Sequence, residues 1–283
     1  MKIYPYAKTS YINKTAPQFR GNGRVVFDKN KKKILNGTAS WFFREDLSWQ
    51  QFINRLILKY KDVEKVNINI YGCSEGAEVF SVLMLLIEKL GIKKAQKFFP
   101  IQAKDIDEVI LKRPMQGIIT PTKNCVKNIK NNMGDNYFKY LNFDSVFVKN
   151  EELQSEVCNG KVNKILKDNV IFEQKDIMED IESIGGKDNT IVMCRNLWPY
   201  LPAENRQILA QKIFDNLGDN SMCVIGKFDK YANAENYLIN AGFKYTDIPY
   251  YFVKNSSGQI MAFENLNNII PKKKKFFIIH ENS

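Results

Sequence analysis

A strand, a glycine turn and an apolar helix follow one another at residues 66–90, and this unit constrains the fold more than any other stretch. Residues 66–71 (VNINIY) alternate β-branched and polar residues, which predicts a buried strand. After the turn at residues 72–76 (GCSEG), apolar residues recur at helical spacing from Val79 to Leu90, and Gly91 is expected to cap the helix. Such a unit begins an α/β fold that binds a nucleoside ligand, because the glycines admit the ligand to the backbone and the helix N-terminus offers free amides.

The turn itself favours one kind of nucleoside ligand. The spacing of Gly72 and Gly76 lacks the fuller glycine fingerprint that a pyrophosphate requires. Glu78, in the first turn of the helix, would repel a phosphate but suits an ammonium group or a ribose. These residues therefore point to S-adenosylmethionine (SAM) rather than to a dinucleotide.

The rest of the chain continues the α/β pattern. Further strands are expected at residues 98–103, 169–172, 190–194 and 222–226, separated by helical segments, and residues 243–253 have the pattern of antiparallel strands. This order predicts a doubly wound sheet with an antiparallel edge, the α/β layout of a class I (Rossmann-like) methyltransferase. We expect a basic N-terminal arm at 1–35, a methyltransferase domain at 36–270 with an inserted small subdomain at 113–168, and a basic C-terminal tail at 271–283.

Charge and composition limit the classes of partner that this protein can have. The net charge of +11 makes nucleic acid or an acidic protein surface a possible partner. Part of this charge lies in lysine runs at 29–33 and 272–275, which are typical of solvated ends, and no nucleic-acid-binding motif accompanies them, so nucleic acid is not favoured. No apolar stretch is long enough to span a bilayer, and residues 1–14 lack a secretory signal. The five cysteines are an odd number without paired spacing, and two of them lie in predicted core strands, which indicates a reducing compartment. We therefore expect a cytoplasmic protein.

Polar residues mark the ends of the predicted strands. The single histidine, His280, lies three residues from the end, which argues against a histidine-based triad or a histidine-rich metal site. Asp105 ends the second strand, where nucleotide-binding α/β folds hold a ribose, whereas Asp107 is the better candidate for a helix N-cap. Asp176 follows the third strand and is either an acceptor for an adenine amino group or a solvated loop carboxylate. Arg44 follows three aromatic residues and belongs either to a lid that faces the ligand or to a surface ion pair.

Several stretches, in the same order, resemble the CheR family of chemotaxis-receptor glutamate methyltransferases. Residues 194–201 (CRNLWPYL) are similar to the family's C-R-N-V-x-I-Y-F segment, the most specific of the set. The remaining similar stretches are 38–45 (TASWFFRE), 72–81 (GCSEGAEVFS), 104–107 (KDID) with 117–118 (GI), and 172–177 (FEQKDI). The resemblance covers roughly residues 38–228 and lacks the family's helical N-terminal domain.

The resemblance implies roles for individual residues. It places Glu78 at the methionine or ribose end of SAM, and Asp105, followed by Ile106, at the ribose hydroxyls. It places Asp176 and Ile177 at the adenine, and the pocket lining includes Gly72, Gly76, Asn196 and Leu197. Arg44 and Tyr200 would face the methyl-transfer site as catalytic residues, with Thr38 and Ser40 nearby.

The function predicted in this way is SAM-dependent transfer of a methyl group to a carboxylate, with a protein as substrate. An in-line displacement at a sulfonium methyl needs an oriented nucleophile and little acid–base chemistry, so the lack of a usable histidine is no objection. Two alternatives stay open: a methyltransferase that acts on nucleic acid or a small molecule, and a SAM-binding module without catalysis. The second is motivated by departures from the family pattern at Thr38, Ser40, Ala77 and Asp176.

Overall fold

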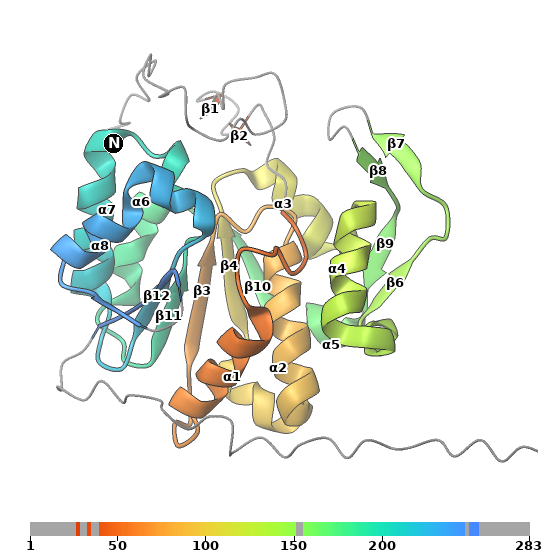
Figure 1. The fold of residues 1–283 in the computed structure, drawn as a ribbon, viewed down its shortest axis with the longest axis horizontal. Coiled ribbons are helices and arrows are strands. Elements are labelled where there is room, and N and C mark those ends of the chain that lie inside the picture. The colour runs from red at the N-terminus through yellow and green to blue at the C-terminus, as the bar shows by residue number, and fades with distance from the viewer. Residues whose placement is uncertain (1–26, 29–32, 35–39, 151–154, 247–248, 255–283) are drawn as a thin grey trace, which may run out of the picture.

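The central sheet has seven strands, five of them parallel. The computed structural model describes residues 27–28, 33–34, 40–150, 155–246 and 249–254. The sheet order is β10-β4-β3-β11-β12-β14-β13, and β14 pairs antiparallel with both β12 and β13 (Figure 1). The strands are β3 (Asn67–Tyr71), β4 (Ile101–Asp105), β10 (Val170–Gln174), β11 (Thr190–Met193), β12 (Met222–Val224), β13 (Lys244–Tyr245) and β14 (Tyr251–Val253). The predicted doubly wound sheet with an antiparallel edge, the class I methyltransferase arrangement, is confirmed.

Alternating side chains of the central strands enter two separate hydrophobic layers. Ile191 and Met193 pack in one layer, whereas Val192 and Cys194 pack in the other, as the two-residue period of a strand requires. Helices α1 (Trp49–Lys59) and α2 (Ala77–Ala95) cover the first face, and α6 (Ile177–Asp180), α7 (Ala203–Asn216) and α8 (Ala234–Asn240) cover the second (Figure 1). Because helices cover both faces of the sheet, a ligand can reach it only at the ends of the parallel strands.

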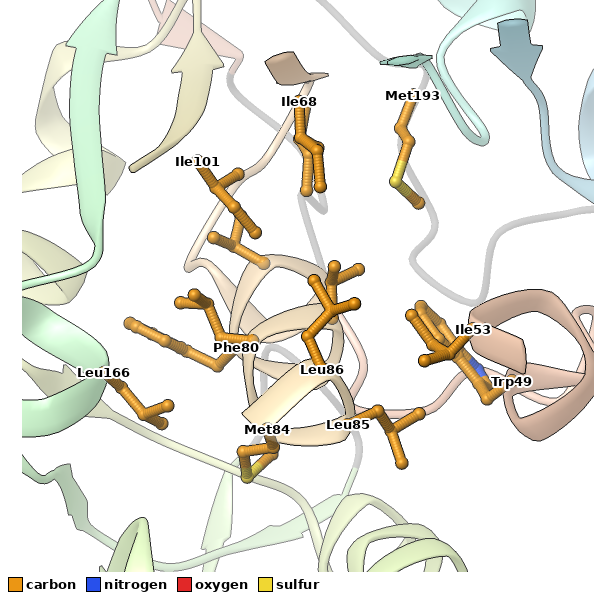
Figure 2. Packing of buried hydrophobic residues seen from close by; sticks show 14 of the residues in the cluster. Trp49, Ile53, Ile68, Phe80, Met84, Leu85, Leu86, Ile101, Leu166 and Met193 are labelled. Atoms are coloured by element: carbon orange, nitrogen blue, oxygen red, sulfur yellow. The ribbon is translucent and has the colours of Figure 1, made fainter. Parts of the chain in front are cut away.

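Helix α2 is buried on nearly all sides. Figure 2 shows its side chains pointing toward the sheet at Ile68 and Met193, toward α1 at Trp49, and toward Leu166 on the other side. Leu83, Met84 and Leu86 have no exposed surface. A helix that is apolar around its whole circumference is held by packing rather than by one face, so its first turn has a fixed position at the end of β3.

The structure confirms one predicted boundary and corrects another. Gly91, with φ +71°, ends the helical run that begins at Ala77, as predicted; a short second run continues α2 to Ala95, and the 3₁₀ turn η1 (Gln96–Phe98) follows. The second strand begins at Ile101 rather than at Phe98, because Phe98 belongs to η1 and Pro100 cannot donate a ladder hydrogen bond.

The segment 113–168 contains a separate small sheet. Strands β5, β9 and β6 pair antiparallel, and β7 pairs with β8. Its helix α4 was not predicted. The elements from β4 to β10 are α3 (Glu108–Met115), β5 (Ile118–Ile119), α4 (Lys123–Met133), η2 (Gly134–Lys139), β6 (Leu141–Phe143), β7 (Val148–Asn150), β8 (Ser155–Val157), β9 (Gly160–Val162) and α5 (Lys164–Lys167). The domain limits stay a prediction.

Short elements complete the described chain. β1 (Phe27–Asp28) pairs antiparallel with β2 (Lys33–Ile34), while the rest of the predicted arm and the whole predicted tail lie outside the described residues. The 3₁₀ turns η3 (Ile181–Ile184), η4 (Trp198–Tyr200) and η5 (Lys227–Ala232) follow α6, β11 and β12. No helix in the described part of the chain combines the length and hydropathy needed to cross a membrane.

Candidate active site

The glycine turn after β3 lies against the ends of two neighbouring strands. Gly72 and Gly76 have φ +67° and +78°, a region that favours glycine. A Cβ on Gly72 would lie 3.0 Å from a methyl carbon of Leu197, and a Cβ on Gly76 would lie 3.0 Å from the ring of Phe80 and 3.1 Å from that of Phe172. Both glycines are therefore required by conformation and by close approach, and the predicted pocket residues Gly72 and Leu197 lie side by side.

Asp105 fixes this turn to the end of β4. Its Oδ2 accepts a hydrogen bond from the Ser74 amide at 2.8 Å, and its Oδ1 accepts one from the Asp107 amide at 3.0 Å. Burial raises the pKa of Asp105, and these backbone hydrogen bonds oppose the rise. A carboxylate has about four lone-pair sites, so both oxygens can still accept from a ribose. Asp107 forms the predicted N-cap of α3, accepting from the Val109 amide at 2.9 Å.

The loop after β10 is tied to the loop after β4. The Lys175 amide donates to the Asp105 carbonyl at 2.9 Å, and the Gln174 side chain donates to the carbonyl of the half-buried Ile106 at 3.0 Å. Asp176 caps α6 by accepting from the Met178 amide at 2.9 Å, and burial raises its pKa. The N-cap thus occupies one carboxylate oxygen of Asp176, and its predicted contact with an adenine would use the other.

Ile177, the other predicted residue after β10, is buried and packs in the hydrophobic layer beneath α6, α7 and α8. The side chain of Ile177 therefore packs beneath the loop that leads into α6.

The loops after β11 and β12 share one buried carboxylate. Asn196 has φ +58°, and its amide donates to Asp229 at 2.6 Å, while its side-chain oxygen accepts from the Phe228 amide at 3.3 Å. The amides of Gly226 and Trp198 donate to the same carboxylate at 2.6 and 3.0 Å. Burial raises the pKa of Asp229 to about 7. This carboxylate fixes the backbone of Asn196 and, through it, that of Leu197.

Glu78 is bound by an arginine at the end of β11. Its Oε2 accepts from Nη1 of Arg195, and Nη2 of the same guanidinium contacts Oδ1 of Asp46 at 2.5 Å. The Arg195 side chain has no exposed surface and lies over the Trp49 ring, 5.1 Å from Cζ to the ring centroid. Burial acts to lower the pKa of Arg195, but the charges of Glu78 and Asp46 hold it above its ordinary value. The predicted contact of Glu78 with SAM would therefore use its Oε1.

The charge of Arg44 acts on Tyr200, which follows β11. Burial raises the pKa of Tyr200 to about 12, and the positive charge of Arg44 opposes the rise. Burial also raises the pKa of Glu78, opposed by Arg195 and by Arg44. The Arg44 guanidinium lies over the ring of Trp41, 5.5 Å from the centroid. The positive charge of Arg44 thus acts on both Glu78 and Tyr200, and its place in a lid stays a prediction.

Two further predicted positions lie in the same segment as Arg44. Ser40 is half-buried at the start of the described segment, whereas Thr38 lies outside the described residues.

Sequence reasoning missed three charged residues of this site. Arg195 was quoted in a motif but given no role, although a charged residue directly after a predicted buried strand signals a buried partner. Asp229 was also given no role. Asp46 carried no such signal, because its partner Arg195 is 149 positions away in the chain.

A cavity of about 580 Å³ lies elsewhere, between α2 and the α4–η2 segment. Asn131, Asn132 and Asn136 are among its lining residues, and none of the predicted site residues lines it. The candidate site is therefore identified by the convergence of strand ends rather than by this cavity. In the described part of the chain, no cluster of three or more histidine, cysteine or acidic side chains is arranged to hold a metal ion.

The residues at the strand ends fit SAM. Gly72 and Gly76, both of positive φ, hold the turn tightly against Leu197, Phe80 and Phe172 at the carboxyl end of β3. In the predicted roles, Glu78, Asp105 and Asp176 would supply carboxylate acceptors for the ammonium, ribose and adenine groups. The surplus of acids over the two arginines also suits a cationic sulfonium ligand.

Comparison with known proteins identifies the family. The family described as "CheR methyltransferase, SAM binding domain" matches residues 38–246. A chemotaxis protein methyltransferase of Borreliella burgdorferi is 28% identical over 247 residues, covering 83% of this chain and 79% of that protein. Chemotaxis protein methyltransferase 2 of Vibrio cholerae is 24% identical over 195 residues, covering 68% of this chain and 62% of that protein, so the chain spans less than two thirds of this second relative.

The family match includes the glycine turn, the acids after β4 and β10, and the loops after β11 and β12 described above. The chain therefore belongs to the CheR methyltransferase family and is a SAM-dependent methyltransferase.

Proposed function

We propose that this enzyme transfers the methyl group of SAM to a glutamate carboxylate of a protein, specifically of a chemotaxis receptor. The observation that carries the proposal is the position of Arg44. Its carbonyl accepts from the indole of Trp49 at 2.9 Å, beside the buried Arg195–Asp46 pair after β11, and its charge acts on both Tyr200 and Glu78. A cation beside a phenol can bind and orient a carboxylate acceptor. The curated relatives, whose names describe chemotaxis protein methyltransferases, support the same acceptor.

The state of the site's carboxylates also favours an acceptor that is already ionised. A glutamate has a pKa of about 4.3 in a free chain and needs no base at neutral pH. An amino acceptor would have to lose a proton. Among the described residues of the site, Glu78 is paired with Arg195, Asp105 accepts two amides, and Asp229 accepts three. Because these carboxylates already accept the hydrogen bonds that hold the loops in place, none of them is assigned as a general base.

The residues would act by orientation. When bound, SAM supplies an electrophilic methyl group on a sulfonium. Arg44 would attract the acceptor carboxylate, and Tyr200, protonated at neutral pH, would donate a hydrogen bond to it. One carboxylate oxygen forms the new bond to the methyl carbon as the carbon–sulfur bond breaks, and no proton is transferred. The contribution of the protein is alignment of the two reactants.

The proposal is tested by the chemical lability of the product. Purified enzyme is incubated with SAM that carries a tritiated methyl group and with the purified cytoplasmic fragment of a chemotaxis receptor. Label that base treatment releases as volatile methanol supports the proposal, because a carboxyl methyl ester hydrolyses in base. Arg44→Ala should lower the rate at least tenfold, on the order expected for a lost charged contact. Lys187→Ala, which removes an exposed cation at the opposite edge of the sheet, should leave the rate unchanged.

A second candidate acceptor is nucleic acid, which the net charge of +11 favours. Base-stable label in RNA or DNA, together with an unlabelled receptor fragment, would overturn the carboxylate proposal.

A further inference from the structure

The two carboxylate oxygens of Asp46 contact two different loops. Oδ1 contacts Nη2 of Arg195 at 2.5 Å, after β11, and Oδ2 accepts from the Lys227 amide at 3.1 Å, after β12. The Asp46 side chain is 5% exposed, so solvent screens these contacts little. Asp46 thus ties the chain around residues 40–48 across the carboxyl ends of two neighbouring strands.

Arg44 is two residues from Asp46, and its backbone is held by the same cluster. The indole nitrogen of Trp49 donates to the Arg44 carbonyl at 2.9 Å, and the Leu47 amide donates to it at 3.3 Å. The ring of Trp49 in turn lies against the Arg195 guanidinium. Asp46, Trp49 and Arg195 therefore form one packed unit around the backbone of Arg44.

A third attachment fixes the segment on its other side. The Phe43 amide donates to the Ser81 hydroxyl of α2 at 3.1 Å, and Phe43 has φ +47°. Ser81 lies one turn beyond Glu78 on α2. Residues 43–46 are consequently held at α2, at the β11 loop and at the β12 loop, and the Arg44 side chain extends from the middle of this span.

We propose that Asp46 is a positioning residue for methyl transfer: it holds the segment that carries Arg44 over the strand ends, so that the guanidinium stays beside Tyr200. The inference rests on the proposed role of Arg44 as the residue that orients the acceptor. It assigns no contact between Asp46 and either reactant. The prediction specific to positioning is that loss of Asp46 lowers kcat, while the cofactor, held by other residues, still binds.

The test is a double-mutant cycle between Asp46 and Arg44. Asp46→Asn keeps the shape of the side chain and an oxygen for the Lys227 amide but removes the charge that faces Arg195. Binding of S-adenosylhomocysteine is measured by calorimetry, and kcat is measured at saturating SAM with the receptor fragment. We expect kcat to fall by about tenfold to a hundredfold, the scale of a small misplacement of a reacting group. The dissociation constant of S-adenosylhomocysteine should stay within about threefold, because the Arg195–Glu78 contact remains.

In the Arg44→Ala background, Asp46→Asn should cause no further loss of kcat, because the residue that it positions is already absent. Glu45→Gln is the matched control: it neutralises the exposed acid between the two residues and should leave kcat unchanged. Retained binding of S-adenosylhomocysteine shows that each variant is folded.

The outcomes separate the two claims. If Arg44→Ala lowers kcat but Asp46→Asn does not, the positioning role is wrong while the role of Arg44 stands. The positioning role is equally wrong if the kcat losses of Arg44→Ala and Asp46→Asn multiply in the double variant, since Asp46 would then act independently of Arg44. Full kcat in Arg44→Ala would remove the proposed role of Arg44 and this inference with it.

Discussion

The carboxylate of Asp229 accepts a hydrogen bond from the backbone amide of Asn196 at 2.6 Å, although the two residues follow different strands. The same carboxylate accepts from Gly226 and Trp198, so one buried acid organises both loops. A Cβ on Gly226 would lie 2.4 Å from the Asn196 side chain, which shows how closely these loops approach. The backbone that carries Asn196, Leu197 and Tyr200 is therefore set by Asp229.

Asp229 should make stability depend on pH. Burial raises its pKa from 3.8 to about 7, so between these values the folded state binds one more proton than the unfolded state. Its contribution to stability is fully present at the acid end of this window and is lost as pH rises through 7. The free energy of unfolding of the wild type, relative to Asp229→Asn, should fall by about 1 kcal/mol per pH unit across the window. Urea denaturation at several pH values measures this difference, and a constant difference would contradict the account.

Gly76→Ala should weaken both folding and cofactor binding. The new methyl group would lie 3.0 to 3.2 Å from the rings of Phe80 and Phe172, at a φ of +78°. Gly186→Ala provides the control, because Gly186 has φ +73° and nothing within 4 Å of the new Cβ. We expect a loss of about 1 kcal/mol from conformation alone at Gly186 and about 3 kcal/mol at Gly76, where crowding adds to it. Calorimetry should show weaker S-adenosylhomocysteine binding for Gly76→Ala only, and equal losses in both variants would argue against a crowded turn.

Arg195→Lys should release Glu78. A lysine carries one nitrogen and cannot bridge two carboxylates as the guanidinium does, so Glu78 or Asp46 is left buried without its partner. The free energy of unfolding should fall by about 3 kcal/mol, and S-adenosylhomocysteine should bind about tenfold more weakly, as for one lost charged contact. Asp168→Asn breaks the exposed Lys164–Asp168 pair and should cost less than about 1 kcal/mol. Unchanged cofactor affinity in Arg195→Lys would show that Glu78 needs no fixed orientation.

Tyr200→Phe should separate catalysis from cofactor binding. The pKa of about 12 keeps the phenol protonated at neutral pH, so it can donate to the acceptor carboxylate. Loss of this hydrogen bond should lower kcat about tenfold, since a bond to a charged group contributes about 1.5–3 kcal/mol. The affinity for S-adenosylhomocysteine should not change. The opposite pattern, full kcat with weaker cofactor binding, would move Tyr200 from the acceptor side to the cofactor side.

Much of the fold could be predicted because its signals are local. The strand at residues 190–194 is a β-branched run, and Pro202 and Gly218 bracket helix α7 in the sequence as they do in the structure. Predictions failed where local signals conflicted with tertiary structure. Phe98 was predicted to begin the second strand, yet it is buried in the 3₁₀ turn η1 and the strand begins at Ile101. Helix α4 is rich in asparagine and lysine, and its few buried residues gave too weak a period to predict it.

The candidate site likewise contains residues that local patterns predicted and residues that they did not. The glycine turn and the acids after β4 and β10 are local features of single strand ends, and the structure places them at one edge of the sheet. The network of Asp46, Arg195 and Glu78 joins three segments that are far apart in the chain, so no local pattern could indicate it. Asp107 forms the N-cap predicted for it, whereas Asp176 forms an N-cap that was not predicted, and its contact with an adenine stays a prediction.

A crystal structure of the enzyme with S-adenosylhomocysteine would test the central claim most directly. We predict the homocysteine moiety beside Glu78 and the glycine turn, the ribose at Asp105, the adenine at Asp176, and the sulfur facing Arg44 and Tyr200. A ligand bound away from these strand ends, or one whose sulfur faces away from Arg44, would contradict the account.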